Sequence, residues 1–210
     1  MPQAVVFDIG NVLVRWDMRC LYAKLIDDPR RLDWFLAEVC TLDWHASLDA
    51  GATYADAIAA LVARWPQEAA LIQAYDARWQ ETISGAIEDN VALLAELRAA
   101  GAPVYAITNF PAEKYDETCA RFPFLRTFAD VVVSGRERVR KPDHAIFRIL
   151  LDRNGLRAGD CVFIDDMPAN VAAARALGFH ALRYEPGRDL RPALQELGLP
   201  VKVAASGRAS

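Results

Sequence analysis

Short apolar runs separated by turn residues recur along the chain and predict the buried strands of a parallel sheet. Four such runs lie at 4–7, 104–108, 131–133 and 161–164, and a fifth lies at 181–184. Continuous runs of β-branched and aromatic residues are typical of strands that are covered on both faces. We therefore expect these five segments to form the centre of the fold.

Segments with helical spacing of their apolar positions lie between these runs. They span 90–100, 145–154 and 169–177, and each is followed by a glycine. The three glycines are Gly101, Gly155 and Gly178. A glycine just past the last helical residue is a common stop signal for a helix. Strands that alternate with helices predict an α/β fold with a doubly wound, Rossmann-like parallel sheet.

The segment 17–85 departs from this alternation, because it has no convincing strand pattern but several amphipathic stretches. These stretches lie at 19–26, 29–40, 54–65 and 68–84. Of the five tryptophans, four fall inside the segment and Trp16 lies at its edge. A separate helical module would bury these indoles in its own core and against the sheet.

The sequence therefore predicts three parts of the chain. Residues 1–16 and 86–200 form the α/β core, and residues 17–85 form a small all-helical cap inserted after the first strand. The alternative is that the cap helices belong to the same single domain. Residues 201–210, small and polar from Ala204 onward, are expected to form a flexible tail.

Composition narrows the function classes. The 210 residues are 53% hydrophobic and 25% charged, which is ordinary for a globular α/β protein. A net charge of −4 argues against a nucleic-acid partner. No apolar stretch reaches the roughly 18 residues of a membrane span, and residues 1–3 do not resemble a secretory signal, so no membrane contact and a cytoplasmic location are expected. The composition leaves the oligomeric state open.

Cysteine spacing and one basic run give two further expectations. Cys20, Cys40, Cys119 and Cys161 form no C-x-x-C pair, so we expect reduced structural thiols. The basic run 136–141 is first interpreted as a solvated loop.

Polar and charged residues follow the ends of successive predicted strands. Asp8 follows the first, Thr108 and Asn109 end the second, Lys141 precedes Pro142 after the third, and Asp165 and Asp166 end the fourth. The carboxyl ends of parallel strands meet at one edge of the sheet, where open α/β sheets bind ligands. A hydroxyl, an ammonium and three carboxylates there suit a phosphate and a hard divalent cation. Each residue alone has a simpler explanation, as a helix cap, a surface lysine or an acidic turn.

This ordered set resembles the haloacid dehalogenase superfamily of phosphohydrolases, over about residues 4–184. The insert between Asp8 and Thr108 resembles the small α-helical cap of the first type in that superfamily. The opening Phe-Asp-Ile-Gly-Asn-Val-Leu-Val and the stretch 163–170 are most similar to a bacterial sugar-phosphate phosphatase subgroup.

The resemblance implies a role for each catalytic candidate. Asp8 is the nucleophile that forms an aspartyl-phosphate. Thr108 donates its hydroxyl to the transferring phosphoryl group, and Lys141 neutralises charge on the nucleophile and the phosphate. Asn109 orients Asp8 or, alternatively, caps the turn.

The resemblance also implies a Mg²⁺ site. Its ligands are Asp8, the backbone carbonyl of Gly10, Asp166, and Asp165 directly or through water. A metal is needed because an anionic carboxylate must approach an anionic phosphate.

Gly10 departs from the superfamily pattern, in which a second aspartate two residues after the nucleophile acts as general acid and base. Such catalysis is typically worth ~10²–10⁴-fold. Three things would compensate for the missing aspartate. The substrate would be an anomeric phosphate, which has a better leaving group, or a cap residue or water would supply the proton. Trp44 and His45 of the cap are candidate substrate residues, although a histidine beside a tryptophan is often a core residue. The stretch 49–51 is a second part of the cap that can face the site.

Three functions remain open from the sequence. The first is a Mg²⁺-dependent phosphatase acting on a small phosphorylated metabolite such as a sugar phosphate. The second is a 2-haloacid dehalogenase-type hydrolase that uses the same nucleophile, for which Gly10 would be harmless because a halide leaves without a proton. The third is a non-catalytic member of the fold.

Overall fold

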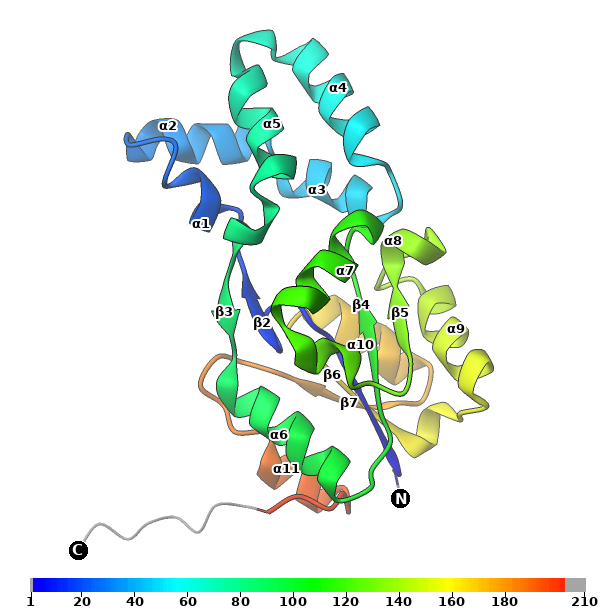
Figure 1. Cartoon of the computed structure of the whole chain (residues 1–210). Helices are drawn as coiled ribbons and strands as arrows, with labels where there is room; N and C mark the ends of the chain where they lie inside the picture. The colour runs from blue at the N-terminus through cyan, green and yellow to red at the C-terminus, as the bar shows by residue number, and fades with distance from the viewer. Residues whose placement is uncertain (1, 203–210) are drawn as a thin grey trace, which may run out of the picture.

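The computed structural model describes residues 2–202 and places five parallel strands in one sheet (Figure 1). The strands are β1 (Ala4–Phe7), β4 (Val104–Thr108), β5 (Val131–Val133), β6 (Cys161–Asp165) and β7 (His180–Arg183). Their order is β5-β4-β1-β6-β7, and each neighbouring pair is parallel. The α/β fold class predicted from the apolar runs is confirmed.

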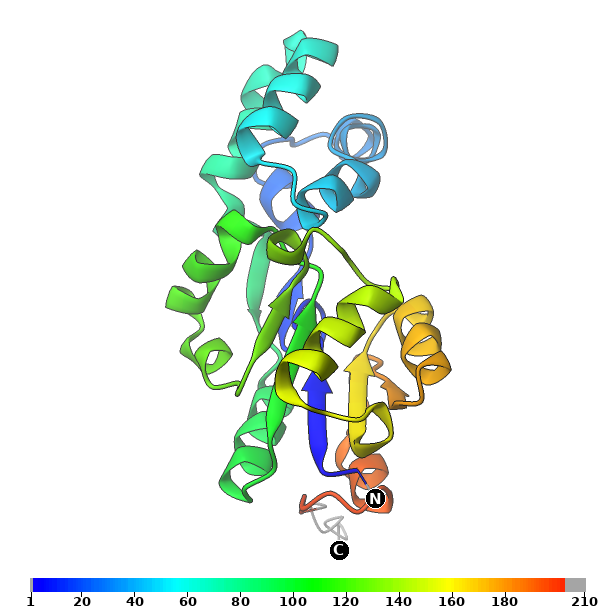
Figure 2. The same cartoon turned by 90° about the vertical axis from the view of Figure 1, so that its right-hand side faces the viewer.

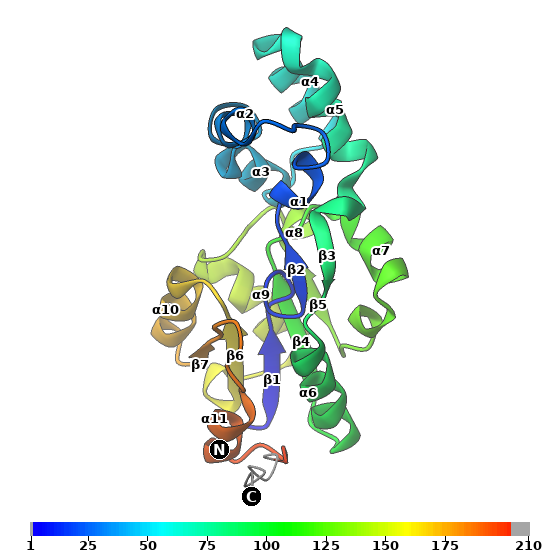
Figure 3. The same cartoon turned by 90° about the vertical axis from the view of Figure 1, so that its left-hand side faces the viewer.

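Helices cover both faces of the sheet, as Figures 2 and 3 show from opposite sides. The helices of the core are α6 (Glu88–Ala99), α7 (Ala112–Arg121), α8 (Ser134–Glu137), α9 (His144–Asn154), α10 (Pro168–Ala176) and α11 (Arg191–Glu196). The spacing of apolar residues identified α6, α9 and α10. It did not identify α7, α8 or α11, because α8 and α11 are too short to show a period and α7 has few apolar residues.

Alternate residues of the strands enter two separate hydrophobic cores. In β1, Val5 and Phe7 belong to one core, together with leucines of α6 and α11. Ala4 and Val6 belong to the other, together with Ile146 and the rest of the apolar faces of α9 and α10. Successive side chains of a strand point to opposite faces, so a strand that is apolar throughout requires helices on both sides.

A helical cap lies beyond the carboxyl edge of the sheet (Figure 1). Its helices are α1 (Arg19–Tyr22), α2 (Pro29–Trp34), α3 (Leu42–Asp49), α4 (Tyr54–Arg64) and α5 (Ala69–Ala77), with a π-helical turn over Phe35–Val39. Asp28, Thr41 and Thr53 cap the amino ends of α2, α3 and α4 with their side-chain oxygens. The stretch 19–26 is helical only as far as Tyr22, and α3 was not predicted.

Aromatic rings fill the interior of this cap. Trp79 is fully buried and packs edge-on against Tyr75 at 5.5 Å and against Phe110 of the core at 5.8 Å. The expectation that the indoles would pack inside the module and against the sheet holds for Trp79. Trp16, Trp44 and Trp65 are partly buried against the same core, whereas Trp34 is 37% exposed.

A second, two-stranded sheet links the cap to the core. β2 (Val14–Trp16) pairs antiparallel with β3 (Ile83–Ala86). The expectation of no strand in 17–85 is therefore wrong at residues 83–85. Ile-Ser-Gly-Ala is too short and polar to show a strand pattern, and it becomes a strand because β2, which is distant in sequence, supplies its hydrogen-bond partners. The cap boundaries at residues 17 and 85 stay a prediction, and they fall next to β2 and inside β3.

The described chain still packs against the core at its carboxyl end. Val201 is buried and the N–H of Lys202 donates to Glu96, so the predicted tail does not begin at residue 201, and its residues 203–210 lie outside the described part of the chain. All four cysteines are free thiols. In the described residues, no helix is long and apolar enough to span a membrane.

Candidate active site

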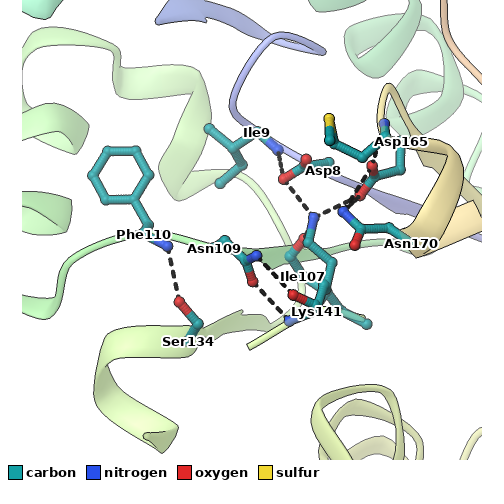
Figure 4. A network of polar contacts seen from close by, with 10 residues as sticks. Asp8, Ile9, Ile107, Asn109, Phe110, Ser134, Lys141, Asp165 and Asn170 are labelled. Atoms are coloured by element: carbon teal, nitrogen blue, oxygen red, sulfur yellow. Dashed lines mark hydrogen bonds and ion pairs between the residues drawn. The ribbon is translucent and has the colours of Figure 1, made fainter. Parts of the chain in front are cut away.

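An ion pair between Asp8 and Lys141 forms the centre of the predicted site (Figure 4). Asp8 directly follows β1, and its backbone N–H continues the sheet by donating to the carbonyl of Ile164. The Nζ of Lys141 lies 2.8 Å from Oδ1 of Asp8. The nucleophile candidate is therefore held on a rigid strand end and faces a cation.

The Lys141 ammonium is fully buried and uses all its donors. Besides Asp8, Nζ contacts Oδ2 of Asp165 at 2.7 Å and the carbonyl of Ile107 at 2.9 Å. Burial alone would lower the pKa of this ammonium, but Asp165 and Asp8 outweigh burial, so the net shift of the pKa is upward. Lys141 therefore stays charged. The expectation of a solvated loop over 136–141 is wrong here, because Arg136 and Glu137 end α8 and Lys141 turns inward.

Asp165 is a fully buried carboxylate whose oxygens are both engaged by protein groups. Oδ1 accepts from the backbone N–H of Met167 at 2.8 Å, and Nδ2 of Asn170 lies 3.0 Å from both oxygens. With the Lys141 contact, these bonds fix the carboxylate against the first turn of α10. Asp165 therefore holds Lys141 in place.

Asp8, Asp165 and Asp166 converge closely enough to hold a metal ion. One carboxylate oxygen from each lies within 4.8 Å of the others. Burial raises the pKa of Asp8 well above its ordinary range, and the two neighbouring carboxylates add repulsion, whereas Lys141 acts in the opposite direction. Burial, followed by repulsion from Asp165, also raises the pKa of Asp166. A divalent cation would relieve this repulsion, so the donor set fits a hard metal.

Thr108 supplies an unused hydroxyl on the neighbouring strand. Its side chain is completely buried, and Oγ1 has no hydrogen-bond partner among the described residues. A buried hydroxyl without a partner costs stability, so this one is consistent with a ligand that accepts its proton.

The geometry of Gly10 leaves room for a side chain. Its φ is not positive, and a Cβ built there would meet no atom within 4 Å. The left-handed residue of this turn is Asn11, with φ of 54°. Gly10 is therefore not required by local sterics, and the missing second carboxylate is a genuine chemical difference.

Asn109 has a different partner from the one expected. Its Oδ1 accepts from the backbone N–H of Lys141 at 2.8 Å, and its Nδ2 donates to the backbone carbonyl of Lys141 at 3.0 Å. Within residues 2–202 these are its side-chain hydrogen bonds, so Asn109 orients Lys141 rather than Asp8. The Lys141–Pro142 peptide bond that follows is cis.

Trp44 and His45 lie on α3 of the cap. The indole N–H of Trp44 donates to the carbonyl of Ala57, which leaves it no donor for a substrate. His45 is buried, stacks on Trp16 with ring centroids 4.6 Å apart, and shares a 2.9 Å hydrogen bond between Nδ1 and the Tyr75 hydroxyl. Burial lowers the pKa of His45 to about 3, so the ring is neutral.

A large cleft opens beside Asp166, between cap and core. Its volume is about 1140 Å³. It is lined on the core side by Asn11, Asp166 and Tyr184, and on the cap side by Arg19 and Leu36. The cleft offers space for the organic part of a substrate next to Asp166.

Sequence reasoning assigned no role to two residues that organise this site. Asn170 holds Asp165, and the Ser134 hydroxyl accepts from the backbone N–H of Phe110 at 2.9 Å, next to Asn109. An asparagine in the first turn of the helix that follows Asp165 was an available signal for the first. Ser134 could not be found, because its partner is brought close only by the pairing of β4 with β5.

Comparisons with known proteins agree with this arrangement. Residues 2–178 match the model of a family described as hydrolase, haloacid dehalogenase-like hydrolase. A sesquiterpene phosphatase from Aspergillus oryzae is 33% identical over 90 residues, which cover 43% of this chain and 46% of that protein. A flavin mononucleotide hydrolase from Arabidopsis thaliana is 30% identical over 113 residues, covering 53% and 45%. These matches span under half the length of both curated relatives.

A solved structure shares the fold over nearly the whole chain. A haloacid dehalogenase family enzyme from Bacteroides thetaiotaomicron, crystallised with magnesium and inorganic phosphate, has a TM-score of 0.72 at 20% identity. The superposition covers 92% of this chain and 99% of that one.

Proposed function

Because the chain belongs to the haloacid dehalogenase-like hydrolase family, we propose that it is a Mg²⁺-dependent phosphatase of a small phosphorylated metabolite, such as a sugar phosphate. The observation that carries this proposal is the pairing of Asp8 with a buried, charged Lys141 beside two further carboxylates. Two curated relatives are named as hydrolases of phosphorylated compounds.

Asp8 is the nucleophile in the proposed reaction. Its carboxylate attacks phosphorus, the bond to the leaving-group oxygen breaks, and an aspartyl-phosphate forms. Water then attacks phosphorus, releases inorganic phosphate and restores the carboxylate. The backbone hydrogen bond between Asp8 and Ile164 keeps the strand end fixed during both steps.

Lys141 and Thr108 stabilise the charge that moves onto the phosphoryl group. The Lys141 ammonium is preorganised by Asp165, Ile107 and Asn109, so it does not need to reorganise during the reaction. The free Thr108 hydroxyl donates to a phosphoryl oxygen.

The residues that would hold the metal are Asp8, the carbonyl of Gly10, Asp166, and Asp165 directly or through water. When bound, Mg²⁺ supplies positive charge that lets the anionic nucleophile approach an anionic phosphate. Because both oxygens of Asp165 are already hydrogen-bonded, we assign this residue mainly to positioning Lys141.

Hydrolysis of 4-nitrophenyl phosphate with Mg²⁺, and after treatment with EDTA, tests the proposal. We expect turnover that requires the metal and that Asp8→Asn abolishes. Asp160→Asn is the matched control, because Asp160 is exposed at the opposite end of β6. Chloride release from a 2-chloro acid without metal would instead support the dehalogenase alternative. No turnover of either substrate class would support a non-catalytic protein.

A further inference from the structure

Apart from the proposed metal ligands, none of the described side chains beside Asp8 is an acid that could protonate the leaving group. An alkoxide is a poor leaving group unless it is protonated as the bond to phosphorus breaks. Gly10 offers no side chain, the Lys141 donors are all engaged, and Asp165 is held by three protein groups. A side-chain proton donor for the leaving group would therefore belong to another element of the fold.

The carboxyl end of α3 brings Asp49 from the cap toward this site. Asp49 is the last residue of α3 and is buried. The loop that follows is pressed against the core, since a Cβ at Gly51 would lie 3.0 Å from the carbonyl oxygen of Gly135 and 2.8 Å from Cγ of Arg138. The same core segment continues to Lys141. Both Lys141 and Arg140 are near enough to act on the charge of Asp49.

Asp49 has little structural reason to be a buried carboxylate. Its Oδ1 has no hydrogen-bond partner among the described residues, and Nε2 of the neutral His45 ring lies 3.5 Å from it. A negative charge at the carboxyl end of a helix also opposes the helix dipole. A buried acid that destabilises its own surroundings is typical of a functional group.

We propose that Asp49 is the general acid and base of the reaction, taking the place of the side chain that Gly10 lacks. This inference rests on the proposed phosphatase function. As Asp8 attacks phosphorus, the carboxylic acid of Asp49 gives its proton to the leaving-group oxygen, and the alcohol departs. The resulting Asp49 carboxylate then takes a proton from the water that attacks the aspartyl-phosphate. Inorganic phosphate leaves, and both aspartates return to their starting states.

The environment of Asp49 suits an acid that works near neutral pH. Burial raises its pKa to about 7, and the charges of Arg140 and Lys141 act in the opposite direction. The ionisable groups that face it come from its own helix, from α4 and α5, and from the core. They are His45, Tyr54, Tyr75, Arg140 and Lys141.

His45 is a positioning residue in this arrangement. Its Nδ1 is paired with the Tyr75 hydroxyl and its Nε2 faces Asp49, which fixes the ring between the two groups. A neutral imidazole whose pKa is about 3 is not a proton donor at pH 7, so Asp49 and not His45 fits the acid role.

The test compares two leaving groups in Asp49→Asn. 4-Nitrophenyl phosphate has a leaving group that needs no proton, whereas glycerol 3-phosphate has an alkoxide that does. With Mg²⁺ present, we expect kcat on glycerol 3-phosphate to fall by ~10²-fold or more and kcat on 4-nitrophenyl phosphate to change by less than about tenfold. Asp43→Asn, an exposed aspartate on the same helix, is the matched control and should change neither rate.

A rescue experiment guards against a merely structural effect. Adding Gly10→Asp to Asp49→Asn should restore at least a tenth of the lost rate on glycerol 3-phosphate, because position 10 has room for the new carboxylate. The wild-type rate on glycerol 3-phosphate should also fall as the pH rises above 7. This decrease should be absent in Asp49→Asn.

The outcomes separate this inference from the proposed function. Equal losses on both substrates, or no loss on either, would overturn the role of Asp49 and leave the phosphatase function standing. A wild type that hydrolyses 4-nitrophenyl phosphate but not glycerol 3-phosphate would also overturn the role of Asp49 and leave the phosphatase function standing. A wild type that hydrolyses neither ester would overturn both.

Discussion

The side chain of Asn109 binds Lys141 through the main chain of the lysine and not through its ammonium. Both polar atoms of the Asn109 amide are used, one by the N–H and one by the carbonyl of Lys141. The backbone of Lys141 is therefore held in one position, and from there its ammonium reaches Asp8 and Asp165. The Asn109 amide, just after β4, thus sets the position of a cation in the segment that follows α8.

Asn109→Ala should impair catalysis through Lys141. The change leaves two backbone groups of Lys141 without partners, at a cost of about 1–3 kcal/mol each where they are shielded from water. We expect a lower kcat on 4-nitrophenyl phosphate with little change in KM, and a lower melting temperature. Asn154→Ala, which removes an asparagine that bonds Asp130 away from the site, is the control for lost hydrogen bonds. Full activity in Asn109→Ala would show that catalysis does not depend on the positioning of Lys141 by Asn109.

Lys141→Met should both inactivate and destabilise the protein. Removing the ammonium leaves Asp8 and Asp165 buried without their shared cation, and breaking a buried pair typically costs about 3–5 kcal/mol. Denaturant unfolding measures the loss. Combining the change with Asp165→Asn should recover part of the stability but no activity. If the losses in free energy of unfolding were instead additive in the double variant, the two residues would not be coupled.

Thr108→Val should separate activity from stability. Valine has nearly the shape of threonine, and the hydroxyl that it removes is buried without a partner. We expect an unchanged or higher melting temperature together with a clear loss of kcat. A drop in stability with normal turnover would show that the hydroxyl serves the fold and not the phosphoryl group.

Mg²⁺ should stabilise the protein by relieving repulsion among Asp8, Asp165 and Asp166. A ligand at about 100 times its Kd adds roughly 2.7 kcal/mol to the free energy of unfolding. For a chain of this size, that is a rise of roughly 5–10 °C in the melting temperature. Asp166→Asn should abolish most of the rise and Asp160→Asn should not. An equal Mg²⁺ effect in both variants would place the metal elsewhere.

Asp49→Asn should stabilise the protein at high pH and not at low pH. The folded-state pKa of Asp49 is about 7, above the ~3.9 of an unfolded chain. Well below the unfolded-state pKa of ~3.9 the group is protonated in both states and has no effect. As the pH rises toward 7 the unfolded chain ionises first, so wild-type stability falls by a total on the order of 4 kcal/mol. Between pH 4.5 and 8.5, the melting temperature of Asp49→Asn should rise increasingly above that of the wild type. A constant difference between the two melting temperatures would contradict the raised pKa.

The sequence alone determined the parallel sheet and the edge at which its chemistry gathers. Strands buried on both faces are apolar throughout, and the glycines after their helices mark clear stops, so both signals are local. The end of each parallel strand then predicted that Asp8, Thr108, Lys141 and Asp166 would approach one another. This followed from topology, without any knowledge of distances.

Tertiary structure decided which partner each polar group takes. Asn109 bonds Lys141 and not Asp8, and β3 forms only because β2 lies beside it. Gly51, which follows α3, meets Gly135 and Arg138 of the core only because the cap folds over the sheet. Hydrogen bonds and pKa shifts depend on atoms that are far apart in the chain and on the exclusion of water between them. No local pattern encodes these conditions, because they arise only when the packing of cap against core is complete.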